Sequence, residues 1–315
     1  MKSELSAKTL AAYESTINAI YKALRLTTLS DGARPDSGDW IEKHWKHIVE
    51  HVEASASIHT KKNRYAVLKV YATLYDLPDK ICDFLDGKMG ELAGKVTADY
   101  STNKMSEKVE ANWVGVKEMR TMLETLKLKL SNAIDTYAEY QALCKYLMLC
   151  IHIEVPLRND LAGAQILTAA PKSFDDKTNY IIIKSKKSGQ IILNDYKTRK
   201  EYGSKTIDLS ASVCAELHKY YPVIKEMSQH GWFICDRSDP TKPISRTTYT
   251  KWFQSIFKGT GKNVSTTQVR RAVVSDLYDV DEDEMKKKQA LAGVMGHSVQ
   301  QAGLSYTKHL KDDQK

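Results

Sequence analysis

The chain has 315 residues, of which 42% are hydrophobic and 27% are charged. That length fits two domains of ordinary size, and that composition is typical of a globular protein, which argues against a disordered, collagen-like or membrane-embedded chain. The longest apolar stretch, residues 146–153, is too short to cross a bilayer, and the first residues lack the basic-then-apolar layout of a signal peptide. We therefore expect an intracellular protein with no membrane partner.

The formal net charge is +8, and the two parts of the chain carry it unequally. Residues 1–108 hold 16 Lys and Arg against 15 Asp and Glu, and the remainder holds 31 against 24. A basic C-terminal part favours a polyanionic partner, because Lys and Arg on phosphates release counterions. The five cysteines are scattered, without a C-x-x-C pair or a zinc-ligand spacing, which indicates reduced thiols and no metal site.

Helical periodicity dominates the first third of the chain, and it predicts helices at residues 6–25, 39–52 and 57–75. The opening turns of the third helix carry three basic residues, Lys61, Lys62 and Arg64. These either contact DNA phosphates or form a solvated helix face.

The region that follows is rich in glycine and small polar residues. Gly87, Gly90 and Gly94 fall within residues 87–105, which are predicted to be a linker between two domains. The predicted domains are therefore residues 1–86 and residues 106–315.

The C-terminal part begins with a helical block at residues 106–153, after which the hydrophobic period changes. Three short runs rich in β-branched residues predict an antiparallel sheet with strands at residues 180–184, 190–194 and 205–209. Helical patterns then return at residues 212–226, 245–257, 266–278, 283–293 and 298–310. The predicted fold class is mainly α with a small antiparallel β-sheet.

Four separated motifs lie in this part of the chain. Val-Pro-Leu-Arg ends at Arg158, and Asp-Tyr-Lys-Thr-Arg at residues 195–199 lies between the second and third predicted strands. Thr-Thr-Gln-Val-Arg-Arg at residues 266–271 opens a predicted helix. Gly-His-Ser follows, and Tyr306 lies nine residues beyond its His297.

In order and spacing these motifs resemble those of the tyrosine recombinases, the phage integrase family. That family has an Arg in its first motif, a Lys in a β-turn, a His-x-x-Arg motif, a Gly-His motif and a Tyr about nine residues later. Residues 6–13 also resemble the first helix of the family's core-binding domain. The resemblance covers nearly the whole chain. It implies a helical core-binding (DNA-clamping) domain at 1–86, a linker at 87–105 and a mixed α/β catalytic domain at 106–315.

The resemblance also implies a role for each residue. Arg158 and Arg270 would clamp the nonbridging oxygens of a DNA phosphate and neutralise the charge of the transition state. Lys197 would give a proton to the leaving 5′-oxygen, and His297 would contact a phosphate oxygen or help position the attacking group. Tyr306 would be the nucleophile that forms a 3′-phosphotyrosine. This chemistry requires no metal, ATP or other cofactor.

Two positions depart from the family pattern. Thr267 stands where the family has the His of His-x-x-Arg, and a hydroxyl cannot carry a proton near neutral pH as imidazole does. The family also has an acid three residues after its first Arg; Leu161 stands there, and the nearby acid is Asp160. Asp160 could orient Arg158 from this displaced position.

The implied function is site-specific recombination or integration on double-stranded DNA with a specific target site, with self-association as a dimer or tetramer on that DNA. Mobile elements and DNA viruses are the natural sources. The location would be with DNA, in the cytoplasm or nucleoid of a bacterium, or in the host nucleus or virus of a eukaryote.

Three alternatives remain open. A type IB DNA topoisomerase shares the active-site chemistry, although the helical N-terminal third favours a recombinase. A catalytically silent DNA-binding protein on an integrase scaffold is favoured by Thr267. If the match is accidental, the chain is a helical binding module.

Overall fold

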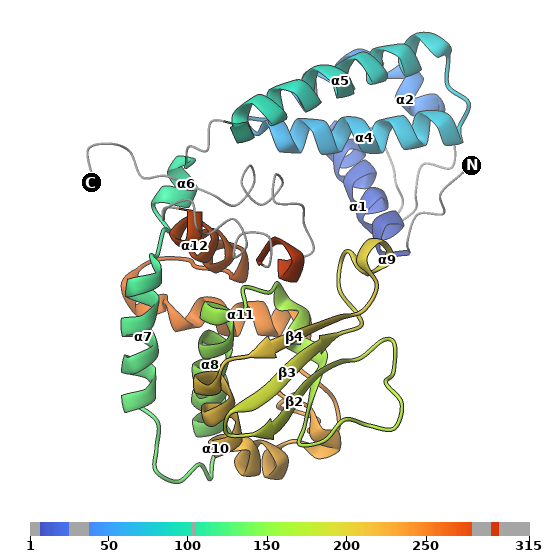
Figure 1. Ribbon diagram of the computed structural model, residues 1–315. Helices are drawn as coiled ribbons and strands as arrows, with labels where there is room; N and C mark the ends of the chain where they lie inside the picture. The colour runs from blue at the N-terminus through green and yellow to red at the C-terminus, as the bar shows by residue number, and fades with distance from the viewer. Residues whose placement is uncertain (1–6, 25–37, 102–104, 279–290, 296–315) are drawn as a thin grey trace. The chain divides into compact units, whose positions relative to one another are not determined.

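The computed structural model describes residues 7–24, 38–101, 105–278 and 291–295. The chain forms two compact units, Met1–Thr102 and Asn103–Lys315 (Figure 1). Each unit has its own hydrophobic core, so each is described by itself.

The first unit is helical and consists of α1 (Ala7–Ala23), α2 (Asp39–Lys43), α3 (Trp45–Glu53), α4 (Ile58–Leu74) and α5 (Asp79–Ser101). Apolar residues at helical spacing on these elements form its core, which includes Ile17, Ile48, Leu68 and Leu85. The helices predicted at 6–25, 39–52 and 57–75 are confirmed, although the second is interrupted at His44. Ser57 caps α4 by accepting a hydrogen bond from the Thr60 N–H.

The linker predicted at residues 87–105 is corrected by the structure, because residues 87–101 continue α5. Leu85, Leu92 and Val96 are buried at spacings of seven and four residues, so one face of this helix packs along its length. A Cβ atom added at Gly87, Gly90 or Gly94 would meet nothing within 4 Å. The packed apolar face therefore outweighs the low helix propensity of the three glycines.

The second unit begins with α6 (Glu107–Glu110), α7 (Val116–Leu128), α8 (Tyr137–Glu154) and the 3₁₀ turn η1 (Asn159–Gly163). The strands are β1 (Ala164–Leu167), β2 (Asn179–Ser185), β3 (Ser188–Leu193) and β4 (Lys205–Leu209), with the short helix α9 (Arg199–Tyr202) before β4. The remaining elements are α10 (Ala211–Met227), η2 (Gln229–Gly231), α11 (Arg246–Ile256), η3 (Lys258–Thr260) and α12 (Thr266–Tyr278).

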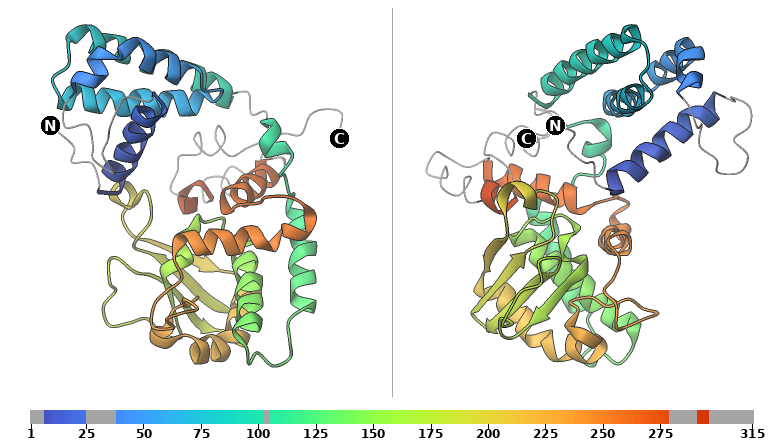
Figure 2. Two further views of the ribbon diagram at one scale, coloured as in Figure 1. Left: turned by 180° about the vertical axis from the view of Figure 1, so that it is seen from behind. Right: turned by 90° about the vertical axis from the view of Figure 1, so that its right-hand side faces the viewer.

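The sheet has the order β1-β2-β3-β4. The three predicted strands correspond to β2, β3 and β4, and they are antiparallel to one another as expected. The sequence did not predict β1, which pairs with β2 in parallel, so the sheet is mixed. Larger helices, among them α8 and α10, gather on one side of the sheet (Figures 1 and 2).

The two faces of the sheet alternate along β2. Ile181 and Ile183 point into the main core, whereas Tyr180 and Ile182 belong to a small cluster on the opposite face. This alternation follows from the two-residue period of a strand. Because both faces are covered, β2 is apolar along most of its length.

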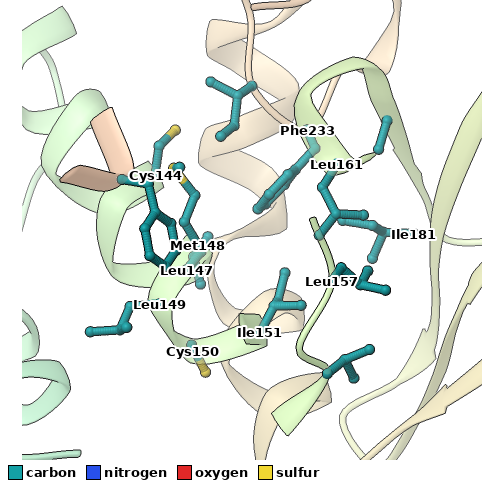
Figure 3. Packing of buried hydrophobic residues seen from close by; sticks show 14 of the residues in the cluster. Cys144, Leu147, Met148, Leu149, Cys150, Ile151, Leu157, Leu161, Ile181 and Phe233 are labelled. Atoms are coloured by element: carbon teal, nitrogen blue, oxygen red, sulfur yellow. The ribbon is translucent and has the colours of Figure 1, made fainter. Parts of the chain in front are cut away.

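Helix α8 runs through the centre of the main core. A capping box between Thr136 and Glu139 fixes its first turn. Figure 3 shows α8 side chains, among them Met148 and Ile151, in one cluster with Leu157, Leu161, Ile181 and Phe233. Complete burial of each such side chain stabilises the fold by about 1.5–3 kcal/mol, so the chain on either side of residue 158 is firmly anchored.

The cysteines are free thiols, as their scattered positions predicted. Four are buried in the second unit: Cys144, Cys150, Cys214 and Cys235. Burial raises the pKa of each of these thiols, that of Cys150 to about 12. Cys82, in the helical unit, is partly exposed.

The helices predicted at 212–226, 245–257 and 266–278 are confirmed as α10, α11 and α12. The helix predicted at 298–310 lies outside the described residues, and of the one predicted at 283–293 the structure describes only residues 291–293, which are helical. Within the described ranges, no helix combines the length and apolar character that a membrane span requires.

Candidate active site

Arg158 lies on the short segment between the end of α8 and η1. Its neighbours Val155 and Leu157 are 3% and 2% exposed, and Leu161 on the far side is fully buried. Arg158 itself is partly exposed. Both flanks of the arginine are thus fixed in the core while its own side chain remains near the surface.

His152, in the last turn of α8, lies against this segment from inside the core. Its Nδ1 is 2.8 Å from the Met148 carbonyl oxygen, and its Nε2 is 3.2 Å from the Arg158 carbonyl oxygen. Burial, and to a lesser extent the charge of Arg270, lowers the pKa of His152 to about 4. A neutral imidazole has one N–H, so the ring donates to one of these two carbonyls at a time. The sequence analysis did not single out this histidine.

Arg270 belongs to the buried face of α12, where it is 1% exposed between Val269 and Val273. A charged side chain is rarely buried to this degree without a partner or a function. The start of α12 is fixed by Gln268, whose Oε1 accepts from the Ser265 N–H at 2.6 Å. Thr267, three residues before Arg270, is exposed on the first turn.

Asp160 lies close to the charges of both arginines. Its carboxyl group belongs to a residue that is 6% exposed, and burial raises its pKa. The charges of Arg246, Arg158 and Arg270 act against that rise, and so does a hydrogen bond from the Arg158 backbone. Arg158, Arg270 and also Arg246 thus lie close enough to Asp160 for their charges to lower its pKa.

Arg246 is the first residue of α11, and the sequence analysis missed it. Its Nη2 contacts the Asp195 carboxylate at 2.8 Å and lies 3.4 Å from the Asp195 carbonyl oxygen. It follows the helix cap Ser245 and lies more than eighty residues from Asp160 in the chain. No local pattern distinguishes such an arginine from an ordinary exposed one at the start of a helix.

Lys197 lies between β3 and β4, in the turn where the sequence analysis expected it. Its side chain is exposed, and among the described residues its ammonium group has no hydrogen-bond or ion-pair partner. The turn around it is held by the Tyr196 hydroxyl, which donates to the Gly203 carbonyl at 2.7 Å. The lysine is thus presented to solvent from an anchored turn.

A second lysine, Lys205, begins β4 at the same end of the sheet. Its Nζ lies 4.8 Å from the centre of the Tyr202 ring and donates to the carbonyl of Gly293. Gly293 belongs to the described segment 291–295, which precedes the Gly-His motif in the chain. Partial burial lowers the pKa of Lys205. In the sequence this lysine stands out only as the first residue of a predicted strand.

His297 and Tyr306, the two other predicted catalytic residues, lie outside the described residues. Among the described residues, no group of three or more His, Cys, Asp or Glu side chains is placed to hold a metal ion.

The predicted DNA-binding residues Lys61, Lys62 and Arg64 lie on α4 of the helical unit. Lys61 Nζ is 3.0 Å from a carboxylate oxygen of Glu53, and Arg64 Nη1 is 3.5 Å from the His51 carbonyl oxygen. These contacts favour a structural role within the helical unit for Lys61 and Arg64. Their contact with DNA stays a prediction.

Glu53 is the centre of a small polar network. Besides Lys61 it accepts from the Tyr65 hydroxyl at 2.9 Å, and Lys88 Nζ lies 3.2 Å away. The hydrogen bond from Lys61 is the largest cause that lowers the pKa of Glu53 to about 2.

Comparison with known proteins gave no matching family model and no matching curated protein. The solved structures that are similar in fold include two of a site-specific recombinase. The XerH site-specific recombinase bound to difH substrate in a pre-cleavage complex has a TM-score of 0.54 at 14% identity, over 94% of this chain and 75% of that one. XerH bound to a palindromic difH substrate in a post-cleavage complex has a TM-score of 0.51 at 13% identity, over 94% and 72%. The chain therefore has the fold of these site-specific recombinases, which is the fold that the resemblance to tyrosine recombinases implied.

Proposed function

We propose that this chain is a tyrosine-type, site-specific DNA recombinase that cleaves and rejoins strands through a 3′-phosphotyrosine. The observation that supports the proposal is that the charges of both Arg158 and Arg270 act on the buried Asp160 carboxyl group, although Arg270 lies on α12, more than a hundred residues further along the chain. The fold shared with recombinases that were solved on DNA substrates supports it.

In the proposed reaction, Arg158 and Arg270 bind the two nonbridging oxygens of the scissile phosphate. In this proposal Asp160 orients the pair, because the charges of both arginines act on its carboxyl group. The charge of the phosphate increases toward the transition state, so two preorganised guanidinium groups stabilise that state more than the substrate.

Tyr306 is the proposed nucleophile. Its phenolic oxygen loses its proton to water and bonds to phosphorus, the bond from phosphorus to the 5′-oxygen breaks, and Lys197 donates a proton to that leaving oxygen. His297 contacts a phosphate oxygen or positions the attacking group. The phosphotyrosine bond retains the energy of the phosphodiester, so a 5′-hydroxyl rejoins the strand without ATP. In this mechanism the two arginines provide the charge stabilisation, without a metal ion.

The proposal also assigns roles to larger parts of the chain. In this proposal the helical unit, residues 1–102, is the core-binding domain and residues 103–315 are the catalytic domain, and both contact duplex DNA that contains a specific target site. Copies of the chain assemble on that DNA as a dimer or tetramer, and the protein acts where DNA is, in a mobile element or a DNA virus. The net charge of +8 supports a polyanionic partner.

Covalent trapping tests the proposal. A target site is first selected from a random duplex library by binding, and it is then synthesised with a nick beside the cleavage position, so that the cleaved strand cannot be rejoined. Wild-type protein is expected to give a protein–DNA band that survives SDS. Tyr306→Phe is expected to bind the duplex and give no such band, while the control Tyr221→Phe, on α10, traps as wild type does.

The same substrates separate the alternatives. A topoisomerase would relax supercoiled DNA that lacks the selected site, whereas a recombinase exchanges strands between two copies of it. A silent binder would give no covalent band with any variant. A band of undiminished intensity from Tyr306→Phe would exclude this tyrosine as the nucleophile.

A further inference from the structure

Asn179, at the start of β2, is a buried amide whose hydrogen-bonding capacity is fully used. It is 3% exposed. Its Nδ2 donates to the carbonyl oxygens of Asp160 at 2.7 Å and Asp195 at 2.9 Å. Its Oδ1 accepts from the N–H groups of Asn194 at 2.7 Å and Asp195 at 2.8 Å. Two donors and two acceptor positions are all that an amide side chain offers.

These four bonds join two segments that carry proposed catalytic groups. Asp160 lies two residues after Arg158, and Asp195 lies two residues before Lys197. A single side chain thus joins the arginine segment to the lysine turn.

Arg246 closes this connection into a ring. Its guanidinium holds the carboxylate of Asp195 at 2.8 Å, and its own carbonyl oxygen lies 3.4 Å from Nδ2 of Asn159. Since Asn159 precedes Asp160, the ring runs from η1 through Asn179 and Asp195 to α11 and back to η1. A closed set of bonds restricts the turn more than separate contacts would.

The two segments differ in how firmly they are held by other groups. The arginine segment is anchored in the core by Leu157 and Leu161 and is contacted by His152. In the lysine turn, Tyr196 is buried and its hydroxyl donates to the Gly203 carbonyl, but Asp195 and Lys197 on either side of it are exposed. Loss of the Asn179 amide should therefore loosen the backbone of the turn at Asp195 and leave the arginine segment in place.

We propose that Asn179 is a positioning residue, which fixes the Lys197 turn relative to Arg158 through the backbone of Asp195 and Asp160. This inference rests on the proposed function. In the step concerned, the Tyr306 oxygen gives up its proton to water and bonds to phosphorus, the bond to the 5′-oxygen breaks, and a proton passes from Lys197 Nζ to that oxygen. Asn179 touches none of these atoms and acts only through the turn.

The first test needs no DNA. Hydrogen–deuterium exchange is measured for the peptide that spans residues 195–202 in wild type, Asn179→Ala and Asn194→Ala. Asn194 is a matched control, because it is equally buried and its Nδ2 holds only the carbonyl oxygens of Asp175 and Thr178. With bonds worth about 1 kcal/mol each, Asn179→Ala should accelerate exchange in this peptide by roughly tenfold, and Asn194→Ala by much less.

Equal acceleration in the two variants, or none in Asn179→Ala, would overturn the proposal. Asn179→Asp keeps the shape of the side chain and both acceptor bonds, and it replaces the alanine variant if that variant does not fold. With the aspartate, exchange should again increase in the peptide 195–202 while the peptide around Arg158 stays protected.

The second test uses the leaving group. In a substrate whose 5′-oxygen at the scissile phosphate is replaced by sulfur, the thiolate leaves without a proton, so a misplaced general acid matters little. On the ordinary phosphodiester, Asn179→Ala should slow single-turnover cleavage by about tenfold or more, and on the sulfur substrate by much less. Arg158→Ala should slow both substrates alike. An equal loss for Asn179→Ala on both would refute its action through Lys197.

The two failures are distinguishable. If wild type forms no covalent band on either substrate, the proposed function fails, and the exchange experiment still decides whether Asn179 holds the turn. If wild type cleaves and the exchange of the peptide 195–202 is unchanged in Asn179→Ala, only the positioning role is refuted.

Discussion

Each of the two units contains a carboxyl group with cations nearby, and the pKa values of the two groups shift in opposite directions. In the helical unit, Glu53 accepts hydrogen bonds from Lys61, Lys88 and Tyr65, and its pKa falls to about 2. In the second unit, Asp160 lies among the charges of three arginines, yet burial raises its pKa. The side chain of Glu53 is 33% exposed, whereas Asp160 is 6% exposed.

The two carboxyl groups differ in how far they compensate the charges of the neighbouring cations. Around Glu53, direct hydrogen bonds neutralise the neighbouring cations, so little charge remains for an outside partner. Around Asp160, burial raises the pKa of the carboxyl group while the charges of Arg158 and Arg270 act on it, and Arg246 is already paired with Asp195, so a positive field remains there from Arg158 and Arg270. Such a field would attract a DNA phosphate. Substitutions around Asp160 and around Glu53 can test this difference between the two environments.

The largest expected effect lies on the Asp160 side. Arg158→Ala and Arg270→Lys should each reduce the single-turnover cleavage rate by about a hundredfold or more, since each removes a preorganised contact to the transition state. The lysine variant keeps the charge at the buried position. Binding to the selected duplex, measured in parallel, should fall far less, because many other basic residues contact the backbone.

Two controls accompany these variants. Arg237→Ala removes an exposed arginine of the same unit that stacks over Tyr137, and Lys88→Met removes a cation of the Glu53 network. Both should cleave at close to the wild-type rate. If Lys88→Met lost as much activity as Arg270→Lys, the distinction between the two carboxyl environments would be wrong.

On the Glu53 side the expected effect is on stability. Tyr65 is fully buried and donates to the Glu53 carboxylate at 2.9 Å. Tyr65→Phe should lower the free energy of unfolding by about 1.5–3 kcal/mol, the usual cost of a lost hydrogen bond to a charged group. Urea unfolding followed by circular dichroism measures this change. Cleavage under native conditions should be unaffected, and a loss of cleavage at unchanged stability would contradict the structural role.

A smaller effect concerns pH. The folded-state pKa of Glu53 lies below its ordinary 4.5, so its stabilisation is complete above that value and is lost as pH falls toward 2. The folded-state pKa of Asp160 lies above its ordinary 3.8, so its contribution is present below 3.8 and is lost as pH rises through the folded value. The two carboxyl groups thus impose opposite slopes on stability.

Urea unfolding of wild type, Glu53→Gln and Asp160→Asn at pH 3 and pH 6 measures these slopes. The stability difference between wild type and Glu53→Gln should grow by about 1 kcal/mol between the two pH values, after allowance for solvent screening. The difference between wild type and Asp160→Asn should change in the opposite direction. Changes of the same sign would show that burial does not dominate at Asp160.

The smallest expected effect is at Thr267. Because Thr267 is exposed on the first turn of α12, an imidazole has room there, and Thr267→His should keep the cleavage rate or raise it by up to about tenfold. Thr267→Ala serves as its control and should cost little if the hydroxyl makes no contact with the phosphate. A sharp loss with histidine would mean that the hydroxyl itself contacts the transition state.

Local patterns were sufficient for most of the fold. The helical period predicted α1, α4, α10, α11 and α12, and the β-branched runs predicted β2, β3 and β4. The four-residue strand β1 was missed because its parallel pairing with β2 depends on residues fifteen positions away. Helix α5 was missed in part because three glycines suggested a break, although the buried spacing of Leu85, Leu92 and Val96 was present in the sequence.

Some residues of the candidate site could be predicted from the sequence, and others could not. Arg158, Asp160 and Arg270 could be named from motifs, since chemistry restricts which residue types occur at those spacings. Asn179 and Arg246 could not, because their partners are backbone carbonyls and a carboxylate brought close only by folding. In the sequence, Asn179 looks like an ordinary turn residue before a strand, and His152 looks like a single interruption in an apolar helix.

The distribution of the thiols has a practical consequence. Alkylation requires an accessible thiolate, and the four cysteines of the second unit are buried with raised pKa values, so they should react slowly with a maleimide dye. Cys82, partly exposed on α5, is then the preferred attachment point. The natural chain would accept a single fluorophore on its helical unit without any engineered cysteine. Quenching of that dye by labelled DNA would report when the helical unit meets the duplex, independently of cleavage.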